Sequence, residues 1–149
     1  MSVLPDKVSH GGTYAGNRVA AAAGVKAMEI LRDTNALATV HENGRRVQAG
    51  VKTVLDAKGI AHHFTGCPAM FAVMFTDRVV TEWREWANTD HALYDAVAVG
   101  MHARGAMPEP DSREPWFVCE AHAQGDIVDR TLQIFSDSLD AALEARARG

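Results

Sequence analysis

The first half of the chain carries two helical patterns of hydrophobic and polar positions. Residues 19–31 are almost all alanine, valine, methionine, isoleucine or leucine, and the polar positions Lys26 and Glu29 share one narrow stripe. A helix with this pattern is buried on most of its circumference. We expect it to begin at Arg18 with Asn17 as its N-cap. The rest of the chain offers too few elements to surround this helix, so a partner subunit or further polypeptide is expected to cover it.

A longer amphipathic helix is predicted next. The run Asp33-Thr34-Asn35 stops the first helix and caps the second, which continues to Lys58-Gly59. The inner positions of the second helix recur three and four residues apart and are Leu37, Val40, Gly44, Val47, Val51 and Val54. Gly44 lies on this apolar stripe, where the missing side chain would let another backbone segment approach closely.

The second half of the chain mixes short extended segments with helices. Residues 60–66 and 69–75 are typical of two strands joined at Gly66-Cys67-Pro68, and residues 116–120 are typical of a third. A single helical turn is expected to carry two tryptophans with both rings on one side, Trp83 and Trp86. These segments predict a small sheet of about three strands.

Two further helices complete the pattern. The first is capped by Asn88-Thr89-Asp90, is closed by Gly105, and directs inward Leu93, Tyr94, Val97 and Met101. The second begins near Gly125-Asp126, and its inner face is Ile127, Thr131, Ile134, Phe135, Leu139 and Leu143. The whole pattern predicts an α+β fold in which helices cover one face of the sheet.

Composition and charge narrow the function classes. The 149 residues are 47% apolar and 23% charged, as in a globular domain, and the net charge is −4. Lysine and arginine are scattered, which argues against a surface for nucleic acid or an anionic membrane. No apolar run approaches the roughly 20 residues of a transmembrane helix. The first residues lack a secretory signal pattern, so a cytoplasmic protein is expected.

The cysteines and histidines form no reactive or metal-binding motif. Cys67 and Cys119 are far apart in the sequence and form no C-x-x-C motif, so we interpret both as structural thiols. His122 follows Cys119 by three residues, and an extended segment would place these two side chains on opposite faces. The adjacent His62 and His63 would also point apart on a strand, and no metal site is expected.

The loop before the first helix is the one local candidate for chemistry. Three glycines surround a hydroxyl in the run His10-Gly11-Gly12-Thr13-Tyr14-Ala15-Gly16-Asn17. Backbone N–H groups, the Thr13 hydroxyl and the positive end of the helix dipole outline a site for a phosphate or a carboxylate. The run matches neither common glycine-rich nucleotide motif, and a plain glycine turn with an asparagine cap is the alternative.

These residues resemble a known family. The run 10–17 and the helix through Ala27-Met28-Glu29-Ile30-Leu31 resemble the segment HxGTxxGNP…AxxAxLexL of class III pyridoxal-phosphate-dependent aminotransferases, most closely the glutamate-1-semialdehyde 2,1-aminomutase-like branch. Met70-Phe71 and Phe75-Thr76-Asp77 resemble the SMF…FFT strand of that branch. The Phe…Ala-His…Asp-Ile…Thr-Leu pattern over residues 117–132 also matches, so the resemblance covers essentially the whole chain.

The resemblance implies a fold, a cofactor and a partner. It implies the carboxy-terminal third of a fold-type I enzyme, with residues 1–33 ending the large cofactor domain and residues 34–149 forming the small domain. In the family, Gly12 and Thr13 would bind the phosphate of pyridoxal 5′-phosphate held by the neighbouring subunit of a homodimer. Glu114 matches a glutamate near the substrate and is a weaker candidate for the substrate side of the site.

The sequence also departs from the family pattern. Arg18 replaces a proline at the first helical position, and Cys67-Pro68-Ala69 stands where a small glycine and serine run is usual. The chemistry needs a lysine that bonds covalently to the cofactor and an acidic partner for the pyridine nitrogen, and both lie upstream in the family. No lysine of this chain lies in a matching motif; the chain has Lys7, Lys26, Lys52 and Lys58. We expect a fragment or a split subunit that is inactive alone.

Two other functions stay open at this point. The chain could be a non-catalytic dimerisation or binding module, with Trp83 and Trp86 in an interaction face, although packing under a helix is the expected role of these rings. It could also be a truncated pseudo-subunit. Transamination and an intramolecular amino shift are both compatible with the resemblance.

Overall fold

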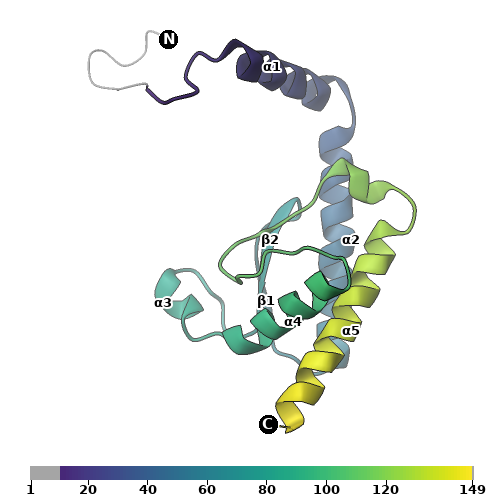
Figure 1. The fold of residues 1–149 in the computed structure, drawn as a ribbon. Helices are drawn as coiled ribbons and strands as arrows, with labels where there is room; N and C mark the ends of the chain where they lie inside the picture. Colours follow the sequence, from purple (N-terminus) through teal and green to yellow (C-terminus); the bar gives the residue numbers. More distant parts are fainter. Residues whose placement is uncertain (1–10, 149) are drawn as a thin grey trace. The chain divides into compact units, whose positions relative to one another are not determined.

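The computed structural model describes residues 11–148, which form two compact units that meet in the sequence between Ala36 and Leu37. The first unit contains the glycine loop and helix α1 (Arg18–Asp33). The other elements are α2 (Ala36–Ala57), β1 (His63–Cys67), β2 (Met70–Met74), α3 (Trp83–Trp86), α4 (His91–Ala103), β3 (Trp116–Phe117), the 3₁₀ helix η1 (Glu120–Ala123) and α5 (Ile127–Arg148) (Figure 1). No helix within residues 11–148 is long and apolar enough to cross a membrane.

Two of the predicted residues, Lys7 and His10, lie outside the described residues. The assignment of residues 1–33 to a larger cofactor domain, and of residues 34–149 to a small domain, stays a prediction. The two compact units are therefore described separately below.

Helix α1 begins and ends where the sequence predicts. The Asn17 side-chain oxygen accepts a hydrogen bond from the backbone N–H of Ala20 at 3.0 Å, which satisfies one free donor of the first turn. At the other end the Thr34 hydroxyl donates to the carbonyl of Ile30 at 2.7 Å. The same hydroxyl accepts from the N–H of Ala36 at 3.2 Å, where α2 begins.

The apolar side chains of α1 have nothing to pack against in their own unit. No residue of α1 is buried, and the exposed fractions reach 79% for Val19 and 66% for Met28. Among the residues described in this unit there is no second helix or strand. A helix this apolar is stable in water only when another surface covers it. That covering surface stays a prediction.

The second unit is built on a three-stranded antiparallel sheet with the order β1-β2-β3. Strands β1 and β2 form the predicted hairpin, in which Cys67 pairs with Met70 across the turn. Strand β3 is short, and it places Trp116 opposite Phe71 on β2. Because side chains alternate along a strand, Phe71 and Trp116 share the face that enters the core.

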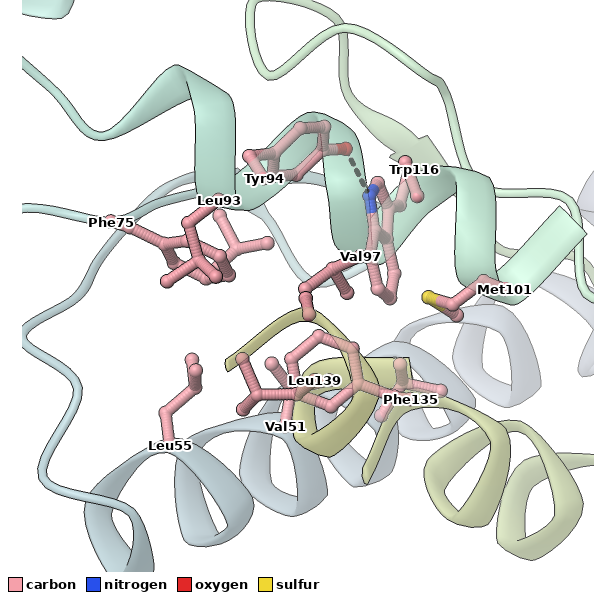
Figure 2. Packing of buried hydrophobic residues seen from close by; sticks show 14 of the residues in the cluster. Val51, Leu55, Phe75, Leu93, Tyr94, Val97, Met101, Trp116, Phe135 and Leu139 are labelled. Carbon is pink, nitrogen blue, oxygen red and sulfur yellow. Dashed lines mark hydrogen bonds between the residues drawn. The ribbon is translucent and has the colours of Figure 1, made fainter. Parts of the chain in front are cut away.

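Helices α2, α4 and α5 contribute the other half of that core (Figure 1), and the predicted α+β class is confirmed. In Figure 2 the inner side chains of α4 point toward those of α2 and α5. The largest fully buried hydrophobic side chains are Phe71, Phe135, Leu55, Met101, Leu139, Val51 and Val73. Burying a side chain of this size contributes roughly 1.5–3 kcal/mol each. The opposite face of the sheet carries a smaller cluster of Ala72, Met74 and Val80, with Trp86 packed against it.

The segment after β3 differs from the prediction. Strand β3 ends at Phe117, and Glu120–Ala123 form a 3₁₀ helix instead of an extended continuation. The backbone N–H of Cys119 donates to Nδ1 of His122 at 2.9 Å. The prediction that Cys119 and His122 lie on opposite faces was wrong, because a 3₁₀ turn folds the third residue back over its cap.

The predicted inner faces of the two long helices, α2 and α5, are only partly right. Leu37 is 51% exposed, while Leu55, which the pattern did not select, is fully buried in the core. On α5, Ile127 is 37% exposed and the neighbouring Val128 is buried. Both misses fall at the border of an apolar stripe, where the packing partner rather than the 3.6-residue period selects the inward position.

Gly44 is the point of backbone contact that its place on the apolar stripe predicts. A Cβ built on Gly44 would lie 1.8 Å from the carbonyl oxygen of Pro68 in the β1–β2 turn. The neighbouring Asn43 is buried, and its side-chain amide donates to the carbonyl of Cys119 at 3.2 Å. One turn of α2 therefore holds both the hairpin turn and the segment that follows β3.

We predict that Gly44→Ala lowers the free energy of unfolding by about 2 kcal/mol. Alanine gains about 1 kcal/mol of helix propensity over glycine. Displacing a backbone carbonyl should cost the upper end of the ~1–3 kcal/mol typical of overpacking. Urea denaturation followed by tryptophan fluorescence measures the difference. Gly24→Ala is the control, because a Cβ there meets no atom within 4 Å; equal stability of the two variants would contradict the prediction.

Candidate functional site

The glycine loop before α1 leaves its backbone open to a ligand. The φ angles of Gly12 and Gly16 are 153° and 76°, a region that favours glycine. The loop turns where the N–H of Ala15 donates to the carbonyl of Gly12 at 2.9 Å. A Cβ built on Gly11 or Gly12 would meet no atom within 4 Å. The absence of side chains at these two positions therefore allows a close approach from outside the unit.

The same loop carries hydrogen-bond donors that no described residue accepts from. Thr13 is exposed, and neither its hydroxyl nor its backbone N–H has a partner within residues 11–148. The backbone N–H of Tyr14 is also unpaired in that range. The positive end of the α1 dipole follows directly and favours negative charge at this point. These groups fit an anion with several acceptor oxygens, such as a phosphate.

Glu114, the second predicted site residue, lies in the other unit on the turn before β3. The turn is closed by the backbone N–H of Glu114, which donates to the carbonyl of Asp111 at 3.0 Å. The backbone N–H of Arg113 donates to Oδ1 of Asp111 at 2.9 Å. Glu114 is exposed, and its carboxylate has no hydrogen-bond partner among the residues that the structure describes. Its oxygens can accept hydrogen bonds from a ligand.

The strand after this turn is fixed by Trp116. Its indole N–H donates to the hydroxyl of Tyr94 at 2.9 Å (Figure 2). That hydroxyl in turn donates to the carbonyl of Glu109 at 2.8 Å. Burial raises the pKa of Tyr94 to about 12, so the hydroxyl keeps its proton. The chain of bonds satisfies two polar groups inside the core and ties α4 to both ends of the segment 109–116.

A cluster that the sequence analysis did not assemble lies beside the turn. The rings of Trp83 and Trp86 are stacked 4.5 Å apart, and the Arg113 guanidinium lies 5.3 Å from each ring centroid. Nε of Arg113 donates to Asp111 at 2.6 Å, and this hydrogen bond lowers the pKa of that carboxyl. The tryptophan spacing predicted that both rings lie on one side of the turn, but not that they stack. The arginine could not be predicted, because its place depends on the path of the loop.

The expected packing of the two tryptophans under a helix is only partly right. Trp86 packs against the small cluster on the outer face of the sheet, whereas Trp83 is 59% exposed. The difference arises because α3 has only four residues and covers the sheet with one ring.

Within residues 11–148 the lysines are engaged in ion pairs, and no cluster of metal ligands is present. Thr13 and Glu114 belong to different units. The three lysines within residues 11–148 are each paired with a carboxylate, as Lys26–Glu29, Lys52–Asp56 and Lys58–Asp140. In the described part of the chain no group of three His, Cys, Asp or Glu residues could hold a metal ion.

A cavity of ≈ 420 Å³ lies between the loop after α4, strand β3 and the start of α5. Its lining combines apolar side chains with Glu109, His122 and Arg130. Neither Thr13 nor Glu114 lines this cavity, so the two predicted site residues belong elsewhere on the surface.

Comparison with known proteins identifies the relatives of the chain. No family model matches it. It is 32% identical to the glutamate-1-semialdehyde 2,1-aminomutase of Thermus thermophilus over 133 residues, which are 89% of this chain and 31% of that protein. It is 29% identical over 138 residues to the enzyme of the same name from Aquifex aeolicus, with 92% of this chain and 32% of that protein covered. The chain is homologous to the carboxy-terminal third of these aminomutases.

Solved structures give the same fold. The PLP internal aldimine form of the Sphingopyxis sp. MTA144 FumI protein matches 95% of this chain with a TM-score of 0.76 and 23% identity, and the match covers 31% of that chain. An omega-transaminase from Sphaerobacter thermophilus matches 91% of this chain with a TM-score of 0.66 and 25% identity, and 30% of that chain is covered. The resemblance to the aminomutase branch and the match to part of a fold-type I enzyme are therefore confirmed. The chain spans about a third of the length of the aminomutases that it matches.

We predict that Tyr94→Phe lowers the free energy of unfolding by about 1–3 kcal/mol, because it leaves the buried N–H of Trp116 without an acceptor. The raised pKa of Tyr94 also makes the native stability fall as pH rises from 10 toward about 12, and the variant should lose that part of the pH dependence. Urea denaturation at pH 7 and at rising pH measures both effects. Tyr14→Phe is the control, since Tyr14 is exposed; an equally stable Tyr94→Phe protein would show that the network adds nothing.

Proposed function

We propose that this chain is the carboxy-terminal part of a pyridoxal-phosphate-dependent aminotransferase or aminomutase and supplies the cofactor-phosphate loop to a partner subunit. The observation that carries the proposal is the open loop at Gly12 and Thr13, before α1, whose donors at Thr13 and Tyr14 have no partner within residues 11–148. The relatives are aminomutases, and the similar solved structures include a transaminase with PLP bound, which supports pyridoxal 5′-phosphate as the cofactor.

In this proposal the residues of the chain bind and orient. The backbone N–H groups of Gly12 and Thr13 and the Thr13 hydroxyl would hold the phosphate, and the α1 dipole would stabilise its charge. Glu114 would contact a small amino-group donor or acceptor from the substrate side. When bound, pyridoxal phosphate supplies an electron sink for the carbon that bears the substrate amino group.

The covalent part of the chemistry would come from polypeptide that this chain lacks. Lys26 and Lys52 lie on helices, Lys58 directly follows α2, and each of these described lysines is paired with a carboxylate, which supports a cofactor-bonding lysine elsewhere. The exposed apolar side chains of α1 support a further polypeptide surface, either in a homodimer or in a complementary upstream chain. The cytoplasm stays the expected location.

We predict that the purified 149-residue chain with added pyridoxal phosphate does not transfer an amino group. Amino-donor consumption above the rate of free cofactor would refute this prediction. Mixing the chain with a separately expressed polypeptide that its upstream coding DNA specifies should produce protein-bound cofactor absorbance and turnover. Cofactor absorbance without turnover would instead favour a truncated pseudo-subunit, and neither signal would favour a non-catalytic binding module.

We predict that Thr13→Ala in that mixed complex weakens cofactor retention about ten- to a hundredfold, which is the effect of losing one hydrogen bond to a charged group. Equilibrium dialysis of pyridoxal phosphate measures retention. Thr13→Ser keeps the hydroxyl and should restore most of the affinity. Unchanged retention in Thr13→Ala would mean that the loop is a structural glycine turn.

A further inference from the structure

The turn that carries Glu114 is held to the rest of its unit by a buried serine. Ser112 is 2% exposed, and its hydroxyl accepts a hydrogen bond from the indole N–H of Trp86 at 2.9 Å. An indole N–H and a hydroxyl that are shielded from water need each other as partners. Because Glu114 follows two residues later, the position of Trp86 determines where the turn lies.

Trp86 is itself fixed from a second side. Its ring lies 3.9 Å from the His91 ring, centroid to centroid, at the start of α4. The imidazole of His91 hydrogen-bonds the Thr89 hydroxyl through Nδ1 at 3.1 Å, and Thr89 is buried. The contact links the tryptophan to the rigid start of α4, so α3 does not rest on the sheet alone.

Arg113 provides a further contact between the turn 111–114 and the two tryptophans. Its guanidinium lies over Trp83 and Trp86 at 5.3 Å and is bonded to Asp111 at the first position of the turn. A guanidinium held by two rings and a carboxylate loses most of its freedom. The turn is therefore anchored by the side chain of Arg113 and by the hydroxyl of Ser112.

We propose that Trp86 is a positioning residue for Glu114. Through its N–H to Ser112 and its face to Arg113, Trp86 holds the turn 111–114 in one conformation and so presents the Glu114 carboxylate at a fixed place. The inference rests on the proposed function, in which Glu114 contacts the substrate. The new element is Trp86, which would determine how well Glu114 is placed to contact the substrate.

Amide hydrogen exchange in the full chain tests whether Trp86 holds the turn 111–114 in one conformation. The N–H groups of Arg113 and Glu114 are both bonded to Asp111, so their exchange rates report how firmly the turn is closed. Trp86→Phe keeps an aromatic ring and removes the N–H, and it should speed both exchange rates about fivefold, as expected for the loss of one hydrogen bond. Ser112→Ala should do the same, and the double variant should be no faster than either.

Trp83→Phe is the matched control. The indole N–H of Trp83 has no hydrogen-bond partner among the described residues, and phenylalanine keeps a ring beneath Arg113. Its exchange rates should stay within about twofold of the parent protein, which is less than the effect of one hydrogen bond. Equal rates in Trp86→Phe and the parent overturn the proposal, as does an equal acceleration in both tryptophan variants.

Kinetics of the mixed complex test the link to Glu114. Trp86→Phe should raise the KM of the amino substrate about fivefold at constant kcat, and should have no effect when Glu114→Gln is already present. An effect of the same size in both backgrounds overturns the positioning role while leaving Glu114 in the site. If Glu114→Gln leaves KM unchanged, Glu114 has no part in the proposed function. The positioning role of Trp86 then fails as well, and the exchange experiment reports only a structural anchor of the turn.

Discussion

The indole of Trp116 is the contact on which the second unit and its candidate site both depend. The ring lies 5.6 Å from Phe71 and 6.1 Å from Phe135, centroid to centroid, so it joins the sheet to α5. Strand β3 has only two residues, and so short a pairing cannot hold a segment by backbone bonds alone. The side chain supplies the missing stabilisation, since it adds large apolar burial and a buried hydrogen bond to Tyr94. The turn that carries Glu114 is thereby attached to the core at its far end.

The first unit follows a different constraint. Helix α1 is well formed from within, with an asparagine cap at one end and a threonine cap at the other. Local capping of this kind decides where a helix begins and ends, but tertiary packing supplies most of its stability. Helix α1 exposes Val25, Ile30 and Leu31, as expected if a further surface covers it. The loop that precedes it would then be presented at the edge of that surface.

Much of this architecture could be predicted from local chemistry. The capping residue Asn17, the hairpin turn and the close approach at Gly44 follow from short-range rules that act within a few residues. The number of strands and the α+β class follow from the extended and helical patterns, whereas the place of β3 beside β2 was not predicted. The prediction for the segment after β3 failed, because a turn held by a histidine side chain replaces the extended continuation. No pattern in the apolar residues records such a polar contact.

The candidate site divides in the same way. The open loop at Gly12 and Thr13 could be identified because glycine and hydroxyl residues before a helix have a direct physical meaning. The anchoring of Glu114 could not, because it joins residues 86, 91 and 113 from three separate segments. Contacts of this type depend on the folded path of the loop, and single-sequence periodicity contains no information about that path.

The described lysines and the described hydrogen-bonding groups of the candidate site differ in their partners. A lysine becomes nucleophilic when burial or a neighbouring cation disfavours its protonated form. Lys26, Lys52 and Lys58 are instead each paired with a carboxylate. Among the described residues, the donors at Thr13 and Tyr14 and the carboxylate of Glu114 have no partner, and such groups are suited to hold a ligand rather than to bond it covalently. In the proposed function, the described residues would therefore bind the cofactor phosphate and the substrate, and the nucleophilic lysine would come from elsewhere.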